Sequence, residues 1–166
     1  MSDKTVPLEK AREAVDQSVL ITGRLFYSFA QELVETLGDE EGIALLRRAM
    51  RRFGTMRGKA IRERTDALGL PPTVATLRQH YDSPLGVSQD AEVIRSEQDY
   101  LEKKARSCGT GRALKALGPD AVKFGPYWCE QDRWLREAYN DRFEYTQLSN
   151  MLLGDDCCHS ILKLKE

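Results

Sequence analysis

The chain has 166 residues, of which 41% are hydrophobic and 31% charged, and its formal net charge is −1. This length and composition are typical of a soluble domain that can bury a core without disulfides. The near-zero net charge provides no overall field for nucleic acid or an anionic membrane, and no apolar run is long enough to span a bilayer. We therefore expect no nucleic-acid or membrane partner, and the sequence leaves a homo-oligomer open.

The first five residues contain no apolar core of a signal peptide, which favours a cytoplasmic location. In that compartment the four cysteines are expected to be thiols or metal ligands rather than disulfides. A loop with proline, glycine and serine over residues 82–90 separates a helical half, residues 8–81, from a mixed α/β half, residues 90–165. We predict one domain over residues 1–166, because neither half has the pattern to bury its apolar face alone.

Two long helices are predicted at the start of the chain. Apolar residues at helical spacing run from about Leu8 to Leu37, with a bend expected near Gly23. Gly38 is a typical C-terminal stop, and the second helix should run over residues 40–68. The apolar stripe of the first helix consists of Val15, Val19, Phe26, Phe29, Leu33 and Leu37.

The second predicted helix carries two glycines four residues apart, Gly54 and Gly58. They lie on one face, and each weakens an isolated helix by ~1 kcal/mol relative to alanine. The pattern therefore predicts that another helix, or else a ligand, approaches this backbone closely. The many arginines of this helix are interpreted as a solvated face, because the chain as a whole is neutral.

The predicted fold class is α+β, in which N-terminal helices pack with a C-terminal antiparallel sheet and helices. For residues 97–106 a helix competes with the strand interpretation, because this stretch contains many good helix formers. The remaining predicted elements are a helix over 73–81 capped by Thr73, a hairpin of strands over 92–94 and 100–107, a helix over 110–117, a helix opened by Pro126 and ending at Tyr139, and strands over 143–153 and 158–164.

Cys129 and Asp132 are three residues apart on a predicted helix, so their side chains should face the same way. Pro126 places Cys129 in the first turn, where the helix dipole favours the nucleophilic thiolate, and Asp132 could move a proton or orient a water. The alternative is a buried core cysteine beside a surface carboxylate. Tyr127 and Trp128 could line a pocket, although aromatic residues at helical spacing more often belong to the core.

The cysteines could instead surround a divalent metal such as zinc, with no cofactor as the alternative. Cys108, Cys129 and either Cys157 or Cys158 would be the ligands, with His159 as a further one. The chain has no CxxC pair, and adjacent residues of a regular strand cannot both point inward.

Four segments in order resemble the L-2-amino-thiazoline-4-carboxylic acid hydrolase family, over the chain from about Leu20 onward. The arginine- and glycine-bearing run over residues 51–64 is similar to a helix of that family. Cys108 precedes a short helix that ends in Leu-Gly, residues 127–132 are similar to its Tyr-x-Cys-x-x-Asp segment, and residues 154–158 resemble its closing Gly-Asp-x-x-Cys strand. Gly109 and His159 depart from the pattern.

The resemblance implies a hydrolase that opens a C–N bond in a small cyclic amidine or related heterocycle. The reaction in the family's name converts the 2-aminothiazoline ring to N-carbamoyl-L-cysteine. The implied catalytic residues are Cys129, Asp132, Cys108 and Cys158, with Cys129 attacking the amidine carbon.

Arg57, beside the glycine pair, is our candidate for binding a substrate carboxylate, because a guanidinium can donate two parallel hydrogen bonds to it. The other substrate-binding candidates are Tyr127, Trp128 and His159. A non-catalytic domain that binds a small molecule, a metal or a thiol-reactive compound, of the fold named after vinyl reductases, is the alternative function.

Overall fold

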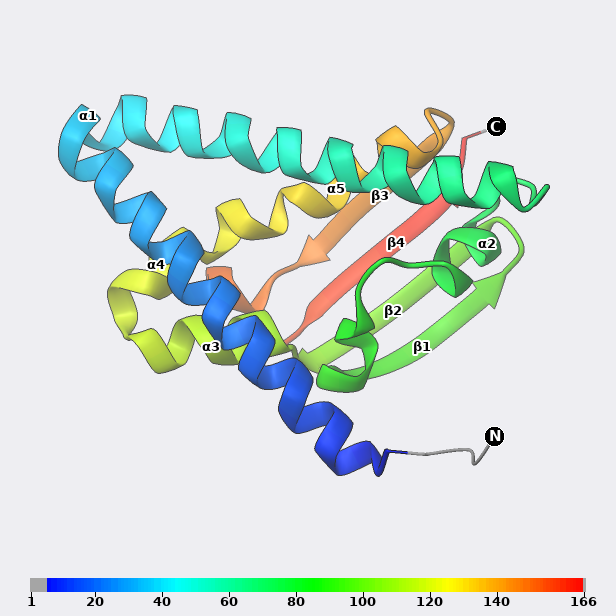
Figure 1. The fold of residues 1–166 in the computed structure, drawn as a ribbon, viewed down its shortest axis with the longest axis horizontal. Helices are drawn as coiled ribbons and strands as arrows, with labels where there is room; N and C mark the ends of the chain where they lie inside the picture. The colour runs from blue at the N-terminus through cyan, green and yellow to red at the C-terminus, as the bar shows by residue number, and fades with distance from the viewer. Residues whose placement is uncertain (1–5, 166) are drawn as a thin grey trace.

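Helix α1 (Leu8–Ala67) consists of two arms that meet at a sharp bend at Gly38 (Figure 1). Gly38 has φ 80° and ψ 167°, a conformation that residues with a Cβ rarely adopt. The prediction of two helices separated at Gly38 is confirmed. The bend expected near Gly23 is wrong, because Gly23 lies in regular helix where α3 (Gly109–Leu117) packs, and the Cβ of Ala113 is 3.3 Å from where a Gly23 Cβ would stand.

The second arm of α1 packs directly against helix α5 (Gln131–Tyr139). A Cβ on Gly54 would overlap the backbone carbonyl of Gln131, and a Cβ on Gly58 would overlap that of Leu135. The predicted close approach is therefore made by a helix.

Helix α2 (Val74–Gln79) follows, capped as predicted by Thr73, whose Oγ1 accepts a hydrogen bond from the Thr76 N–H at 3.1 Å. Helix α4 (Pro119–Cys129) begins seven residues before Pro126, which lies inside it. The helix start predicted at Pro126 is wrong, since Pro119 already occupies the first turn, where a proline is well tolerated. Cys129 thus ends α4 instead of opening a helix.

The sheet has four antiparallel strands in the order β1-β2-β4-β3. They are β1 (Asp90–Glu97), β2 (Tyr100–Ser107), β3 (Phe143–Ser149) and β4 (Cys158–Leu164). The predicted hairpin is confirmed, and β1 is longer than expected. The third strand ends at Ser149, because the 3-10 turn η2 (Met151–Leu153) follows; a similar turn, η1 (Pro84–Ser88), precedes β1.

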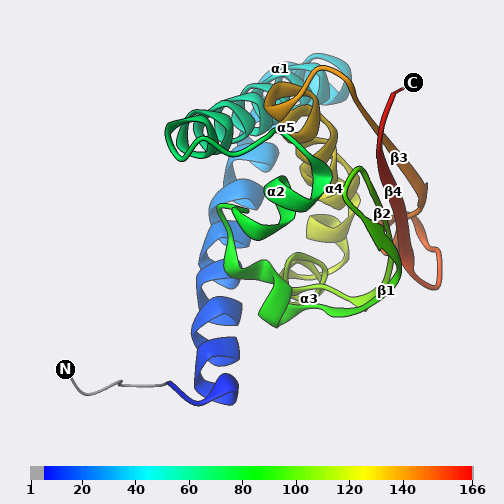
Figure 2. The same cartoon turned by 90° about the vertical axis from the view of Figure 1, so that its right-hand side faces the viewer.

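All helices lie on one face of the sheet, and the other face is uncovered (Figure 2). The structure describes residues 6–165, so the segment behind the signal-peptide expectation lies outside the described residues. In this range the fold class is α+β, as predicted, and no helix is long and apolar enough to cross a membrane.

The buried apolar residues form two clusters, the first between the helices and the sheet and the second among helices α1, α3 and α4 and the turn η2. One consists of Ile61, Val74, Leu77, Leu135, Tyr139, Phe143 and Leu162. The other consists of Phe26, Ala30, Leu46, Leu114, Ala121 and Leu152. Phe29, which the apolar stripe assigned to the core, is 61% exposed. Tyr81 and Tyr145 pack on the first cluster and Cys129 on the second.

Candidate functional site

Three of the four cysteines converge between the helices and the sheet. Cys108 caps α3, Cys129 ends α4 and Cys158 begins β4. Cys158 pairs with the buried Ala105 of β2 and so faces the helices, whereas the sulfur of Cys157 lies 3.7 Å from the hydroxyl of Ser149. Charges on Cys108 and Cys158 both affect the ionisation of Cys129, which places the three thiols in one electrostatic environment.

Cys129 is held as a neutral thiol. Burial is the main cause that raises its pKa far above the usual range, and the nearby charge of Asp132 raises the pKa further, while a hydrogen bond with Asn150 lowers it only in part. The expected help from a helix N-terminus is absent, because Cys129 lies at the end of α4. The resting Cys129 is therefore a poor nucleophile.

Cys108 has the feature that the sequence suggested for Cys129. Its Sγ accepts a hydrogen bond from the Gly111 N–H at 3.2 Å, at the N-terminus of α3. A backbone donor and the positive end of a helix both stabilise negative charge on sulfur. Among the three clustered thiols, Cys108 is the one best placed to react as a thiolate.

Asp132 is a partly exposed anion. Burial acts to raise its pKa, but the charges of Arg136, Lys103 and Arg57 outweigh burial and hold the pKa below its usual value. The Asp132 carboxylate lies 3.2 Å from Arg136 and accepts a 3.5 Å hydrogen bond from the hydroxyl of Tyr81. Its side chain still keeps 36% of its surface accessible, so these partners do not cover it.

Lys103 brings a cation to the same place. It lies on β2 opposite the buried Ser160, on the face toward the helices. Burial and then the charge of Arg136 lower its pKa, whereas Asp132, Cys108 and Cys158 act in the opposite direction. Its Nζ donates a 3.4 Å hydrogen bond to Gln89, and within residues 6–165 no carboxylate lies at ion-pair distance.

Arg57 does not have its guanidinium free for a substrate. Two of its nitrogens donate hydrogen bonds of 2.8 and 2.6 Å to Asp82, and a third donates at 2.5 Å to Gln131. That Arg57 binds a substrate carboxylate stays a prediction, and the structure shows that a protein carboxylate, Asp82, already occupies its guanidinium.

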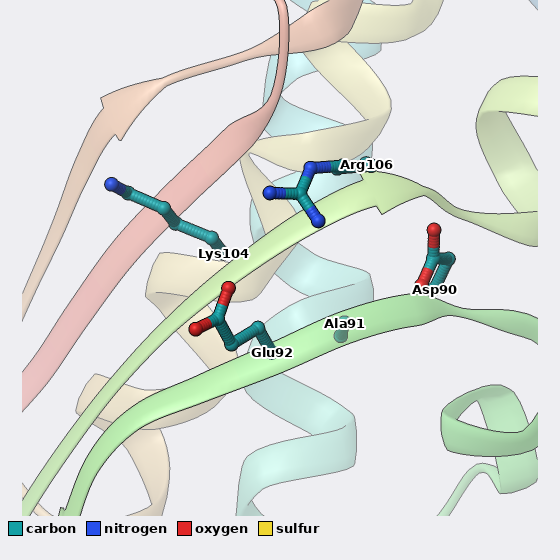
Figure 3. Close-up of a pocket in the computed structure, with 5 residues that line it drawn as sticks. All are labelled: Asp90, Ala91, Glu92, Lys104 and Arg106. Atoms are coloured by element: carbon teal, nitrogen blue, oxygen red, sulfur yellow. The ribbon is translucent and has the colours of Figure 1, made fainter.

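His159 lies outside the cluster, on the uncovered face of the sheet. Its Nε2 lies 2.8 Å from Glu102, and it pairs in register with Lys104. That face also holds a hollow of about 80 Å³, where four charged side chains project from β1 and β2 (Figure 3). The sheet separates His159 from the thiols, so it is removed from the candidate site.

Tyr127 and Trp128 belong to the apolar core around α1. The Trp128 ring packs edge-on against Phe26 at 5.1 Å and lies 6.1 Å from Phe53, and Tyr127 packs on the same cluster. This matches the core alternative weighed for both aromatic residues, and the structure shows no contact that links either ring to Asp132.

No set of three or more histidine, cysteine, aspartate or glutamate side chains is arranged to hold a metal ion, as far as residues 6–165 are concerned. The hypothesis of a zinc site thus gains no support from the geometry of the thiols.

The sequence reasoning missed Lys103, Arg136, Asn150, Tyr81 and Tyr145. Two had a legible signal: Arg136 follows Asp132 by four residues on a helix, and Lys103 occupies an inward position of an alternating strand. The others come from different elements: Asn150 accepts from the Cys158 sulfur at 3.8 Å, Arg136 lies over the Tyr145 ring at 4.2 Å, and Tyr81 reaches Asp132 from 51 residues away.

Comparison with known proteins places this arrangement in a family. The family model described as L-2-amino-thiazoline-4-carboxylic acid hydrolase matches residues 18–162. The chain belongs to this family. The match covers the clustered residues Cys108, Cys129, Asp132 and Cys158, and no curated protein matches the chain.

Two solved structures are similar to this L-2-amino-thiazoline-4-carboxylic acid hydrolase family member. One is a trafficking protein particle complex subunit 3 from Naegleria fowleri covalently bound to palmitic acid, with 18% identity, a TM-score of 0.52, and coverage of 90% of this chain and 96% of that one. Another is the phenol-responsive sensory domain of the transcription activator PoxR with phenol, with 15% identity, a TM-score of 0.48, and coverage of 88% and 74%. The former supports the fold alone.

Proposed function

We propose that the chain is a cysteine-dependent hydrolase that opens the ring of a small cyclic amidine such as L-2-amino-thiazoline-4-carboxylate. The observation that supports this most is the convergence of Cys108, Cys129 and Cys158 with an accessible, ionised Asp132. The chain also belongs to a family named for this hydrolysis. A nucleophilic sulfur and a carboxylate are the groups that attack on an amidinium carbon needs.

Asp132 would bind the amidinium of the substrate. Because the pKa of Asp132 is lowered, it stays an anion at neutral pH and favours the protonated, more electrophilic amidine. A lowered pKa suits this electrostatic role better than the proton transfer expected from the sequence, since a general acid or base works best with a pKa near the operating pH.

Cys108 would be the nucleophile in place of Cys129. Its thiolate, stabilised by the Gly111 N–H, attacks the amidinium carbon and forms a new C–S bond. The ring C–S bond breaks, the ring sulfur leaves as a thiolate that takes a proton from solvent, and the carbon stays bound to Cys108 as an isothiouronium. Water then adds to that carbon, Cys108 departs as a thiolate, and the two protons of the added water return to solvent. Cys129 and Cys158 line the site as neutral thiols, because burial raises the pKa of each.

The atom balance corrects the bond assigned from the resemblance. An amidinium and one water give one urea, one thiol and one proton, and N-carbamoyl-L-cysteine keeps both nitrogens on the reacting carbon. The bond that breaks on the way to this product is thus the ring C–S bond, whereas opening a C–N bond would give the S-carbamoyl isomer.

The test is incubation of purified protein with L-2-amino-thiazoline-4-carboxylate, followed by mass spectrometry and thiol titration. We expect N-carbamoyl-L-cysteine and one new thiol per turnover. Cys108→Ser should lower kcat by at least about 1,000-fold, as expected for loss of a nucleophile, while Cys157→Ser serves as the matched control and keeps full activity.

Full activity of Cys108→Ser with loss of activity in Cys129→Ser would return the nucleophile to Cys129. If the intact protein binds the amidine and forms no product, the hydrolase proposal fails, and the non-catalytic binding domain takes its place.

A further inference from the structure

The charged side chains that surround the clustered thiols do not balance. Arg57 is paired with Asp82, and Arg136 is paired with Asp132. Within the described part of the chain, Lys103 has no carboxylate at ion-pair distance and only the neutral amide of Gln89 as a hydrogen-bond partner. Among these side chains, three cations, Arg57, Arg136 and Lys103, face two carboxylates, so the charged side chains carry one positive charge in excess.

An uncompensated ammonium on the helix-facing side of a sheet is costly, because burial disfavours the charged form. The groups whose charges act on Lys103 are Arg136, Asp132, Cys108 and Cys158. The two cysteines add no negative charge while they are protonated. An anion that enters the site would supply the missing charge. A carboxylate bound by an ammonium forms one of the stronger hydrogen bonds found in proteins.

We propose that Lys103 binds the carboxylate of the ligand, and that the site therefore selects small zwitterions with a carboxylate at Lys103 and a cationic nitrogen at Asp132. The two side chains come from different elements, β2 and α5, and interact electrostatically without forming an ion pair with each other. A ligand that carries both charges pairs with each of the two side chains. The identity of the substrate rests on the proposed function, while the preference for a carboxylate rests on the charge arrangement alone.

Lys103 replaces Arg57 in this role for a geometric reason. The Arg57 guanidinium already donates to Asp82 and Gln131, so a substrate carboxylate would have to displace a protein carboxylate. Arg136 is likewise held, since it donates to the backbone oxygen of Asp132 and contacts the Asp132 carboxylate.

The experiment measures binding by calorimetry at mildly acid pH, where the ring nitrogen of both probes is protonated, with two probes that contain no amidine carbon to hydrolyse. L-thiazolidine-4-carboxylate and thiazolidine differ only in the carboxylate. We expect the intact protein to bind the carboxylate at least about tenfold more tightly, in line with a hydrogen bond between charged groups. Lys103→Met should abolish this preference, Lys103→Arg should keep it, and Lys104→Met, on the opposite face of the same strand, should not change it.

Equal binding of the two probes by the intact protein, or binding of neither, overturns the proposal, as does an unchanged preference in Lys103→Met. If Lys103→Met fails to fold, the two-probe comparison in the intact protein and in Lys103→Arg decides. The hydrolase proposal fails separately. A carboxylate preference without turnover supports carboxylate binding by Lys103 and refutes the hydrolase proposal. Turnover without the preference supports the hydrolase proposal and refutes carboxylate binding by Lys103.

Discussion

The guanidinium of Arg57 and the carboxylate of Asp82 face each other in a two-pronged ion pair, with nitrogen-to-oxygen distances of 2.8 and 2.6 Å. The pair fastens the segment after α2 to the second arm of α1. Tyr81, the residue before Asp82, donates to Asp132, so this ion pair also fixes the position of a hydroxyl at the candidate site. Arg57 thus acts on the site indirectly, by fixing the segment that carries Tyr81.

We expect Asp82→Ala to lower the free energy of unfolding by about 2 kcal/mol, because a half-buried guanidinium loses both charged acceptors. Urea denaturation measures this change. The matched control is Asp66→Ala, which removes the exposed partner of Arg62 one turn away and should cost less than about 0.5 kcal/mol. Equal losses in the two variants would mean that the Arg57 pair is no stronger than a surface pair.

The contact between α1 and α5 depends on the absence of a side chain at Gly58. A Cβ there would overlap the carbonyl oxygen of Leu135, so Gly58→Ala must push the helices apart, and we expect a loss of about 1–3 kcal/mol. Gly86→Ala is the control, because nothing lies within 4 Å of its Cβ position and it should change stability by less than about 0.5 kcal/mol. Thermal unfolding of both variants checks this, and a stabilised Gly58→Ala would contradict the close contact.

Local signals predicted much of this fold. Gly38 marked the bend of α1, and the spacing of Gly54 and Gly58 indicated a helix contact. Such features act through the backbone of the residue itself and are legible in one sequence. The start of α4 was missed because Pro119 and Pro126 both suit a first helical turn. The packing of Gly125 against Leu152 and Leu114, which agrees with a helix that begins at Pro119, is visible only in the folded chain.

The site was predicted less completely, because its charge pairing is a long-range property. Cys108, Cys129, Asp132 and Cys158 were named from the sequence, and the structure brings them together. The ion pair between Arg57 and Asp82 joins residues 25 apart in the sequence, so the sequence alone did not show that the Arg57 guanidinium has a protein partner. Alternation along the last strand already put His159 on the face opposite Cys158, and the strand pairing shows that Cys158, and not His159, faces the helices.

His159 should have no part in ligand binding. His159→Ala is expected to leave thiazolidine-4-carboxylate affinity and any turnover unchanged, since the side chain lies on the far face of the sheet. Its hydrogen bond, and then that of Tyr100, lower the pKa of Glu102 in the folded state. A carboxyl group with a lowered folded pKa stabilises the fold above its unfolded pKa, about 4.3, and the benefit is lost as pH falls below it.

The difference in melting temperature between the intact protein and His159→Ala should therefore be larger at pH 6 than at pH 3. Thermal melts at the two pH values measure it, with Lys163→Ala, which removes the partner of Glu144 on the same face, as a comparison pair. A loss of ligand affinity in His159→Ala would show that the two faces of the sheet are coupled.

Lys103→Met should make the protein more stable at neutral pH while removing carboxylate binding. Burial, and then the charge of Arg136, lower the pKa of Lys103 in the folded state. Between that lowered pKa and the unfolded value of about 10.4, the unfolded chain binds more protons, so the stability of the intact protein rises with pH across this window. Methionine has a similar length and carries no charge to desolvate.

Melting temperatures at pH 7 and pH 10 test this sign. We expect Lys103→Met to exceed the intact protein at pH 7 and the gap to narrow at pH 10, while Lys104→Met, on the uncovered face, shows no such trend. A less stable Lys103→Met at pH 7 would mean that the hydrogen bond to Gln89 and the attraction of Asp132 outweigh the cost of burial. In that case Lys103 would hold the fold together, and the charge excess that we assign to ligand binding would be compensated within the protein.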